Sequence, residues 1–231
     1  MAMERWIDGQ VSKGNKGAAA IGKALLEQFG DVPLLDTVPV TPFILKEQTP
    51  VEVRRFSDEA KAALEKEGYV IDTLTGQSIA SEKAAERKFW STWHQEHPQF
   101  EALTSMQSEV AIKPDQLFIP KSNNTTFAQQ EQLINKFSLD LGKKVPGVVA
   151  VMGGMADYVD LAFAHLEATG DRLFGEKYNY NYARTNTPTV GAGVARVGDF
   201  NPSHGLGVDD WLRDRGSDSV FAAPLVVPKA A

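Results

Sequence analysis

Apolar residues recur every three or four positions in several segments of the chain, and this spacing predicts helices with one buried face. Ser57, Ser81 and either Thr125 or Thr126 can cap three of these helices, because a short hydroxyl side chain accepts a hydrogen bond from the first turn. Glycines follow several of the segments and predict where the helices end. The expected helices cover residues 18–29, 58–67, 81–95, 126–141 and 155–168.

Short apolar runs between these helices predict extended chain. Residues 1–17 are polar and glycine-containing and predict a loose lead-in, whereas the four prolines of residues 31–50 exclude a long regular helix there and favour extended pieces. Prolines, glycines and asparagines separate the remaining runs, as is typical of strands that end in turns. The expected extended segments are a hairpin of 69–72 with 78–80, then 110–112, 117–119 and a buried strand at 147–152.

From Tyr178 to Pro228 the pattern changes to short apolar pieces that alternate with pieces rich in Gly, Asn, Asp and Ser. This is the pattern of short strands joined by long exposed loops. Tyr178, Tyr180 and Tyr182 alternate with asparagines, which places the three tyrosines on one face of an expected strand. The residues expected to hold the scaffold are Val194, Val197, Phe200, Leu206, Val208, Trp211, Val220, Leu225 and Val227.

The same stretch lacks four residue types that are common elsewhere in the chain. The chain has 15 Lys, 15 Glu, 11 Gln and 5 Met, and none of these 46 residues lies in the 51 residues from Tyr178 to Pro228. An even spread would place roughly ten of them there. One explanation is that these residue types favour helices, so a segment of strands and loops has less use for them. The other explanation is genetic, and composition alone leaves both open.

The composition of the whole chain is that of an ordinary globular protein. Its 231 residues are 42% hydrophobic and 23% charged, and the net charge of −6 argues against broad binding to the phosphates of nucleic acids. The absence of Cys excludes disulfides, thiolate catalysis and Cys-bound metals. The first residues lack the apolar core of a secretory signal, and no apolar run approaches the roughly 20 residues of a membrane span. A cytoplasmic protein without a membrane span or cofactor is therefore expected, with its oligomeric state open.

From residue 108 onward, the expected order of strand, helix, short strand and helix, followed by a loop-rich β region, resembles a known fold. Three segments near the end of the chain add to this resemblance. They are Arg196-Val197-Gly198-Asp199-Phe200, Leu206-Gly207-Val208 and the run from Val220 to Val226. They stand where the C-type lectin fold shared with formylglycine-generating enzymes has an Arg-Gly-Gly-Ser-Trp type strand, an Arg-Ser-Ala type strand and a closing Gly-Phe-Arg strand. The closing Arg is absent, since Ala222 or Ala223 takes its place.

The resemblance implies an α+β protein with two parts. Residues 106–231 would form the C-type lectin-like domain, in which two helices pack on a small, mostly antiparallel sheet with long loops. Residues 1–105 would form a mainly helical segment.

Within that fold, the chain is similar to the variable proteins of diversity-generating retroelements. In those systems adenines are copied with errors, so that Asn-type codons scatter over many residues but cannot yield Lys, Glu, Gln, Met or Trp. The depletion of the stretch 178–228 fits this origin. The resemblance implies a non-enzymatic display protein that binds a protein or a small ligand, neither of them identified. The residues expected to bind are Tyr178, Tyr180, Tyr182, Asn186, Asn201, Ser203, His204, Asp209, Asp210, Arg213, Asp214, Arg215, Ser217, Asp218 and Ser219.

Other readings of the sequence stay open. The Gly153-Gly154 turn between a strand and a helix can hold a phosphate, and with Asp157 or His165 it suggests a small enzyme or small-molecule sensor. Calcium bound by the aspartates of residues 209–218, or a metal site at His94 and His97, is a weaker interpretation, because the regular spacing of ligands is missing. A purely structural protein that assembles through its N-terminal helices is the third hypothesis.

Overall fold

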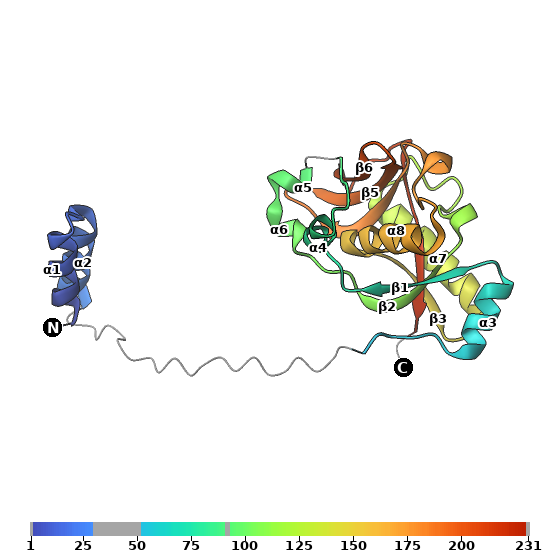
Figure 1. Ribbon diagram of the computed structural model, residues 1–231, viewed down its shortest axis with the longest axis horizontal. Helices are drawn as coiled ribbons and strands as arrows, with labels where there is room; N and C mark the ends of the chain where they lie inside the picture. Colours follow the sequence, from blue (N-terminus) through green and yellow to red (C-terminus); the bar gives the residue numbers. More distant parts are fainter. Residues whose placement is uncertain (1, 30–51, 91–92, 230–231) are drawn as a thin grey trace. The chain divides into compact units, whose positions relative to one another are not determined.

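The computed structural model describes residues 2–29, 52–90 and 93–229 (Figure 1). The chain divides into two units, residues 1–50 and residues 51–231, and each is considered by itself below. The expected extended pieces of residues 31–50 lie outside the described residues. The larger unit begins at Val51, so it includes about fifty residues that the sequence placed in the N-terminal segment.

The first unit contains two helices, α1 (Ala2–Ser12) and α2 (Lys16–Phe29), which pack against each other. The expected loose lead-in is therefore wrong, whereas the helix expected at 18–29 is confirmed with an earlier start. Gly14, at φ 77°, makes the left-handed turn between the helices, a conformation that favours glycine. Ile7 and Ala19 are buried, while Val11 and Ile21 remain exposed.

The larger unit contains two sheets, and the first is antiparallel throughout. It is formed by β1 (Val70–Thr75), β2 (Gln107–Ile112), β8 (Pro224–Pro228) and β3 (Val148–Met152), in the order β1-β2-β8-β3. β8, the last strand in the sequence, lies inside this sheet between β2 and β3. Alternate residues of β8 face opposite sides, since Leu225 and Val227 join one core cluster and Val226 joins another.

The second sheet has the order β6-β5-β4-β7. Its strands are β4 (Tyr182–Pro188), β5 (Gly193–Asn201), β6 (Gly205–Leu212) and β7 (Val220–Phe221). β5 pairs antiparallel with both β4 and β6, and only the short β7 is parallel to its neighbour β4. The larger unit is thus a mixed α/β structure with two mostly antiparallel sheets and several helices.

Helices separate and cover the sheets (Figure 1). α8 (Met155–Thr169) contacts β1 of the first sheet and both β4 and β5 of the second, and most of its residues are buried. α3 (Asp58–Lys66) and α7 (Phe127–Lys144) cover the other face of the first sheet, where their apolar residues join Val226 and Ala111 in one cluster. The order of layers is therefore α3 and α7, first sheet, α8, second sheet.

Local capping signals set three of the helix ends that the sequence predicts. The Ser57 hydroxyl accepts from the Ala60 N–H at the start of α3, and Thr126 forms a capping box with Gln129 at the start of α7. Gly170, at φ 81°, ends α8 in a left-handed conformation. Gly142 was the expected stop of the preceding helix, but α7 continues past it to Lys144.

Four further local predictions are wrong. The hairpin of 69–72 with 78–80 does not form, because β1 pairs with β2 and Ser78 instead caps the short α4 (Ile79–Ala84). The expected helix 81–95 is confined to α4 and to α5 (Trp93–Glu96), with α6 (Pro98–Glu101) following. Residues 117–119 form no strand and follow the short helix η1 (Pro114–Gln116). Tyr178, Tyr180 and Tyr182 do not share a strand, since Tyr178 ends η2 (Glu176–Tyr178), Tyr180 has φ 60°, and only Tyr182 belongs to β4.

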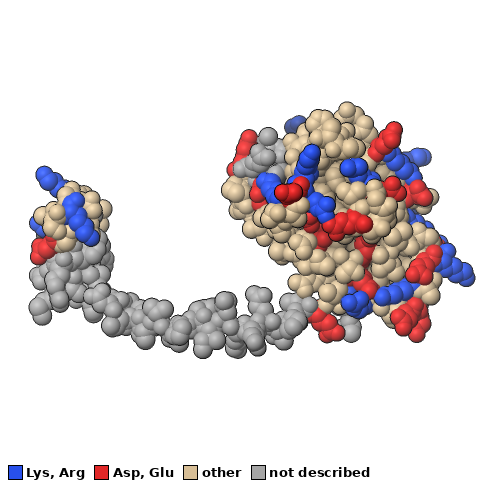
Figure 2. Space-filling model, viewed as in Figure 1, with Lys and Arg blue, Asp and Glu red and all other residues tan. Residues whose placement is uncertain are grey.

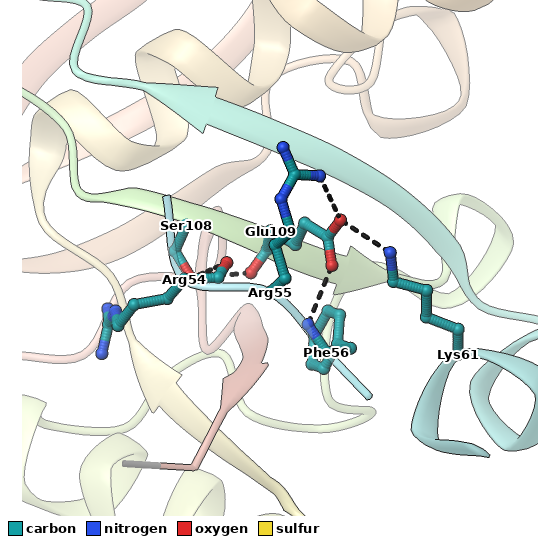
Figure 3. Close-up of polar contacts among 6 residues, drawn as sticks. All are labelled: Arg54, Arg55, Phe56, Lys61, Ser108 and Glu109. Carbon is teal, nitrogen blue, oxygen red and sulfur yellow. Dashed lines mark hydrogen bonds and ion pairs between the residues drawn. The ribbon is translucent and has the colours of Figure 1, made fainter. Parts of the chain in front are cut away.

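Glu109 fixes the beginning of the larger unit to the first sheet (Figure 3). Its side chain is almost fully buried on β2, where it accepts hydrogen bonds from the Phe56 N–H at 2.8 Å and from Lys61 Nζ at 2.8 Å. Arg55 adds a second ion pair at 3.2 Å. Burial acts to raise the pKa of Glu109, but these hydrogen bonds and the two positive charges outweigh it and lower the pKa.

Candidate functional site

The candidate site is the part of the second sheet and its loops that carries most of the expected binding residues. Its middle is the face of this sheet that is turned away from α8. Strand alternation puts Ala195, Val197 and Val208 into the core with α8. Arg196 pairs across the strands with Asp209, so both side chains lie on the opposite face. The next pair on that face is Val194 with Trp211, of which Val194 is buried and Trp211 is half-buried.

Arg196 organises this face. Its guanidinium carbon is 4.4 Å from the ring centre of Tyr182 and 5.3 Å from that of Trp211. Arg196 Nη2 donates to Asp209 Oδ2 at 2.8 Å, while Arg196 Nε is buried without a partner among the described residues. Burial, together with the negative charge of Asp199, raises the pKa of Tyr182 to about 12, so its hydroxyl stays protonated at neutral pH. The result is a stack of rings and a cation with little side-chain freedom.

The loop that follows β6, residues 213–219, is held by its backbone. Its carbonyl groups accept hydrogen bonds from the N–H groups of Phe127 (Arg213 O, 2.8 Å) and Asn124 (Ser217 O, 2.7 Å). Gly216 lies so close to Asn124 that a Cβ on it would come within 2.4 Å of the Asn124 carbonyl carbon. The loop therefore has a fixed path, although Arg213, Asp214, Arg215 and Asp218 expose their side chains.

Arg184 on β4 joins this loop to the sheet from inside. The residue is fully buried, and its Nε donates to Gln130 Oε1 at 2.9 Å. Nη1 donates to the Leu212 carbonyl at 2.9 Å, and Nη2 donates to the carbonyls of Arg215 at 2.9 Å and Thr125 at 3.3 Å. All four acceptors are neutral. Burial lowers the pKa of Arg184 to about 10, and the nearby charge of Arg196 acts in the same direction, so the guanidinium remains charged at neutral pH.

The turn between β5 and β6 forms the other end of the site. Asn201 Oδ1 accepts from both the N–H (2.9 Å) and the hydroxyl (2.6 Å) of Ser203. Ser203 Oγ in turn lies 2.8 Å from His204 Nδ1, and both side chains are exposed. Gly205 has φ 97°, and a Cβ there would lie 2.1 Å from the Lys88 carbonyl oxygen, so both the backbone conformation and the packing require glycine.

The structure separates the expected binding residues along β6. This strand has eight residues, which puts its ends on the order of 25 Å apart. One group surrounds the turn at 201–204 and the other lies in the loop 213–219, with Asp209 between them. Asp210 faces the other side of the sheet, where it accepts a hydrogen bond from Thr189 Oγ1 at 3.0 Å.

Of the expected binding residues, Tyr182 alone is buried. It is therefore part of the framework rather than a contact residue. Asn186 is exposed, but its amide donates to the Met152 carbonyl at 2.9 Å and so ties β4 to β3. Eight of the expected residues are exposed: Tyr180, Asn186, Ser203, His204, Arg213, Asp214, Arg215 and Asp218. Six are partly buried: Tyr178, Asn201, Asp209, Asp210, Ser217 and Ser219.

Sequence reasoning missed Arg184 and Arg196 as parts of the site. Arg196 could have been found, because its neighbour Val197 was expected to face inward and alternation then turns Arg196 outward. No comparable signal exists for Arg184, whose carbonyl partners come from distant loops.

The Gly153-Gly154 turn does not have the open amides that a phosphate would need. The N–H of Gly153 donates to the Tyr158 hydroxyl, that of Gly154 to Asp157 and that of Met155 to the Thr187 hydroxyl. A Cβ on Gly153 would lie 2.4 Å from Leu225, so close packing explains this glycine. His165 is also buried, with its Nδ1 3.4 Å from Asp72 Oδ2, as a core histidine with a partner would be.

The metal interpretations gain no geometric support. Within residues 2–29, 52–90 and 93–229, no three His, Asp or Glu side chains come together in a way that could hold a metal ion. Asp209 is engaged by Arg196, and the ring of His97 packs against those of Trp93 and Phe100. Nothing is described of the His94 side chain.

Charge on the surface is mixed. Figure 2 shows Lys and Arg interspersed with Asp and Glu on the visible face of the larger unit. None of the helices in the described part of the chain combines the length and the apolar character that a membrane crossing requires.

The comparisons with known proteins give no family for the chain. No family model, no curated protein and no solved structure matches it. Function must therefore be argued from the site itself.

Proposed function

We propose that residues 51–231 form a non-enzymatic binding protein with a C-type lectin-like fold, of the kind diversified by retroelements. Its contact surface, here called the display surface, consists of the turn 201–204, the outward residues Arg196, Asp209 and Trp211, and the loop 213–219. Its partner is a protein or a small ligand. The fold assignment is supported by the order β2, α7, β3, α8 followed by short strands that end in β8, the order on which the resemblance rests.

The observation that carries the proposal is the contrast between backbone and side chains in the loop 213–219. Buried Arg184 and the segment 122–127 hold its backbone through hydrogen bonds, while four of its side chains face solvent. Arg213 stacks 4.0 Å from the ring centre of Phe127, but the other three exposed side chains make no hydrogen bond, ion pair or ring contact among the described residues. These three can therefore change without altering the path of the loop. That property is what a surface selected for variable recognition requires.

The composition of the display surface adds support from a different direction. Exposed positions are where Lys and Glu are normally common, whatever the secondary structure. Arg213, Asp214, Arg215 and Asp218 are exposed, yet neither Lys nor Glu occurs between Tyr178 and Pro228. Avoidance of helix-forming residues does not explain this, because solvated loop positions place little demand on helix propensity. Codons derived from Asn codons by adenine substitution do explain it.

The test is to sequence the coding DNA for residues 178–228, with its surroundings, from many closely related isolates. The expected result is a near-duplicate of this segment close by, with substitutions at adenines that fall on exposed positions such as Ser203, His204 and Asp214. Codons for Val197, Leu206 and Val208 should stay constant. Substitutions spread evenly over exposed and buried codons, with no duplicate, would overturn the proposal.

A protein-level test complements the genetic one. Simultaneous randomisation of Ser203, His204, Asp214, Arg215 and Asp218 should leave most library members folded, because these exposed side chains make no hydrogen bond, ion pair or ring contact with a buried residue of the described chain. Randomisation of an equal number of buried scaffold positions in the same strands should leave few folded members. Similar folded fractions in the two libraries, measured by protease resistance, would contradict a display surface.

A further inference from the structure

A small pocket opens beside the turn that joins β5 and β6. It has a volume of about 190 Å³ and is lined by Trp90, Tyr180, Asp199, Asn201 and His204. Since a water molecule occupies about 30 Å³ of liquid, the pocket has room for a small organic group. Its lining residues include two aromatic rings and a carboxylate, but neither Lys nor Arg.

The two aromatic residues offer open ring surface in this pocket. Tyr180 is 69% exposed and Trp90 is 42% exposed, values that are high for large side chains beside a folded core. Trp90 nevertheless has a fixed position, because its backbone N–H donates to the Leu206 carbonyl at 3.3 Å and its indole ring packs on Gly207. A Cβ on Gly207 would lie 2.5 Å from Trp90 Nε1, so the glycine makes room for the indole.

The carboxylate of Asp199 is held at the pocket by an uncommon backbone. Asp199 is only 7% exposed, and both Asp199 (φ 50°) and Tyr180 (φ 60°) adopt the left-handed conformation that non-glycine residues rarely adopt. The Tyr180 N–H donates to Asp199 Oδ1 at 3.3 Å, which is the one hydrogen bond of this carboxylate among the described residues. The ring and the carboxylate therefore reach the pocket together, and the carboxylate retains capacity for another partner.

We propose that this pocket binds an organic ammonium group. Aromatic faces attract a cation through their quadrupoles, and a quaternary ammonium needs no hydrogen-bond acceptor for this attraction. The buried carboxylate of Asp199 adds a negative charge that no lysine or arginine of the pocket lining neutralises. The inference rests on the proposed function only in that Asn201 and His204 belong to the display surface, for which the pocket names a partner chemistry. The source of the group is either a free quaternary ammonium compound or a lysine side chain of a protein partner.

The experiment uses a charged probe and its neutral isostere on the full chain. Choline and 3,3-dimethylbutan-1-ol have nearly the same shape but differ in charge, so their affinities isolate the contribution of the cation. Binding is followed by NMR of the Trp90 indole. The expected result is that choline binds about tenfold more tightly than the alcohol, in line with a cation–π contact in a partly desolvated site. Nα-acetyl-lysine amide as a third probe distinguishes a peptide source from a free quaternary ammonium.

Two variants test the roles of the lining residues. Asp199→Asn removes the charge but keeps a residue type that tolerates the left-handed backbone, and it should weaken choline binding about tenfold without affecting the alcohol. Tyr180→Asn removes the ring and again uses a residue type that tolerates the left-handed backbone, so it should weaken choline binding. Tyr180→Phe keeps the ring and should bind choline as tightly as the parent protein does. Asp214→Asn, at an exposed carboxylate in the loop 213–219, is the matched control and should have no effect.

Equal affinity for choline and the alcohol would overturn the proposal, as would choline binding that survives Asp199→Asn in a variant shown to be folded by circular dichroism. Either failure would leave the library and sequencing results for the display surface untouched. Conversely, failure of those two tests would leave ammonium binding by the pocket intact, so the two proposals are refuted by different measurements.

Discussion

Replacement of Arg184 by methionine tests whether the buried guanidinium holds the loop 213–219 in place. Methionine has a similar length and fills most of the same space, but it donates no hydrogen bond. The substitution strands the oxygen of Gln130, which is fully buried, and removes the Arg184 donors from three backbone carbonyls. Of these carbonyls, that of Leu212 still accepts from the Arg215 N–H at 3.4 Å.

The size of the effect follows from two opposing contributions. A buried acceptor left without a donor costs about 1–3 kcal/mol, and the Gln130 oxygen has no route to water. The carbonyls of Leu212 and Arg215 can turn toward solvent if the loop moves, and removal of a buried charge relieves its desolvation. The expected loss in the free energy of unfolding is therefore about 2–4 kcal/mol, less than four separate penalties for unsatisfied acceptors would give.

Two measurements separate a general loss of stability from release of the loop. Urea denaturation at pH 7 gives the free energy of unfolding. Native-state hydrogen exchange reports on the amides of Asn124 and Phe127, which donate to carbonyls of the loop and should lose protection more than amides of α8 do. The control is Arg215→Met, at an exposed arginine of the same loop, which should change stability by less than about 0.5 kcal/mol. Equal stability of Arg184→Met and this control, with no change in exchange, would refute the role assigned to Arg184.

Two further substitutions test the scaffold around the site. Glu109→Gln should lower the free energy of unfolding by about 1–3 kcal/mol at pH 7, because Lys61 and the Phe56 N–H lose a charged acceptor. The pKa of Glu109 is lowered on folding, so the stability that its carboxylate contributes is present above the unfolded pKa of about 4.3 and is lost as the pH falls through the folded pKa. Urea denaturation of the parent and the Glu109→Gln variant should therefore give free energies of unfolding that converge between pH 7 and pH 3. A difference in stability that stays constant over this range would contradict the role assigned to Glu109. Gly198→Ala should destabilise the protein by several kcal/mol, of order 3 or more, since its Cβ would lie 2.1 Å from the Asn181 carbonyl oxygen. The same change at Gly142, inside α7 and with no atom closer than 3.9 Å, should raise the melting temperature slightly; similar behaviour of the two variants would show that the close approach at Gly198 is relieved at little cost.

The parts of the fold that depend on local signals could be predicted from the sequence. Ser57, Gly170 and one of the two candidate threonines, Thr126, act within one turn of the helices they limit, so the residue type indicated these helix ends. The same signals failed at Ser81 and Gly142, where the helix begins earlier or continues further. The burial of the scaffold residues Val194, Val197 and Val208 could also be predicted, because each is an apolar residue of a short strand. Their faces could not, since Val197 and Val208 face α8 whereas Val194 lies on the opposite face.

The parts that depend on distant partners could not be predicted. β1 pairs with β2 across more than thirty residues, and no local pattern distinguishes that pairing from the expected hairpin with residues 78–80. Arg184 could not be placed, because its carbonyl acceptors carry no residue-specific signal. The tyrosine alternation at 178–182 was misread because Tyr180 adopts a left-handed conformation, which sequence statistics disfavour for a bulky residue.

The interior position of β8 has a consequence for how completely the chain must be made before the first sheet can form. β8 joins β2 to β3, so a chain interrupted before Pro224 leaves two unpaired strand edges and an opened core. A truncation anywhere before Pro224 therefore removes the strand that bridges β2 and β3, whatever other parts of the chain it keeps. The first sheet can therefore close only after residues 224–228 have been synthesised, however early its other three strands become available.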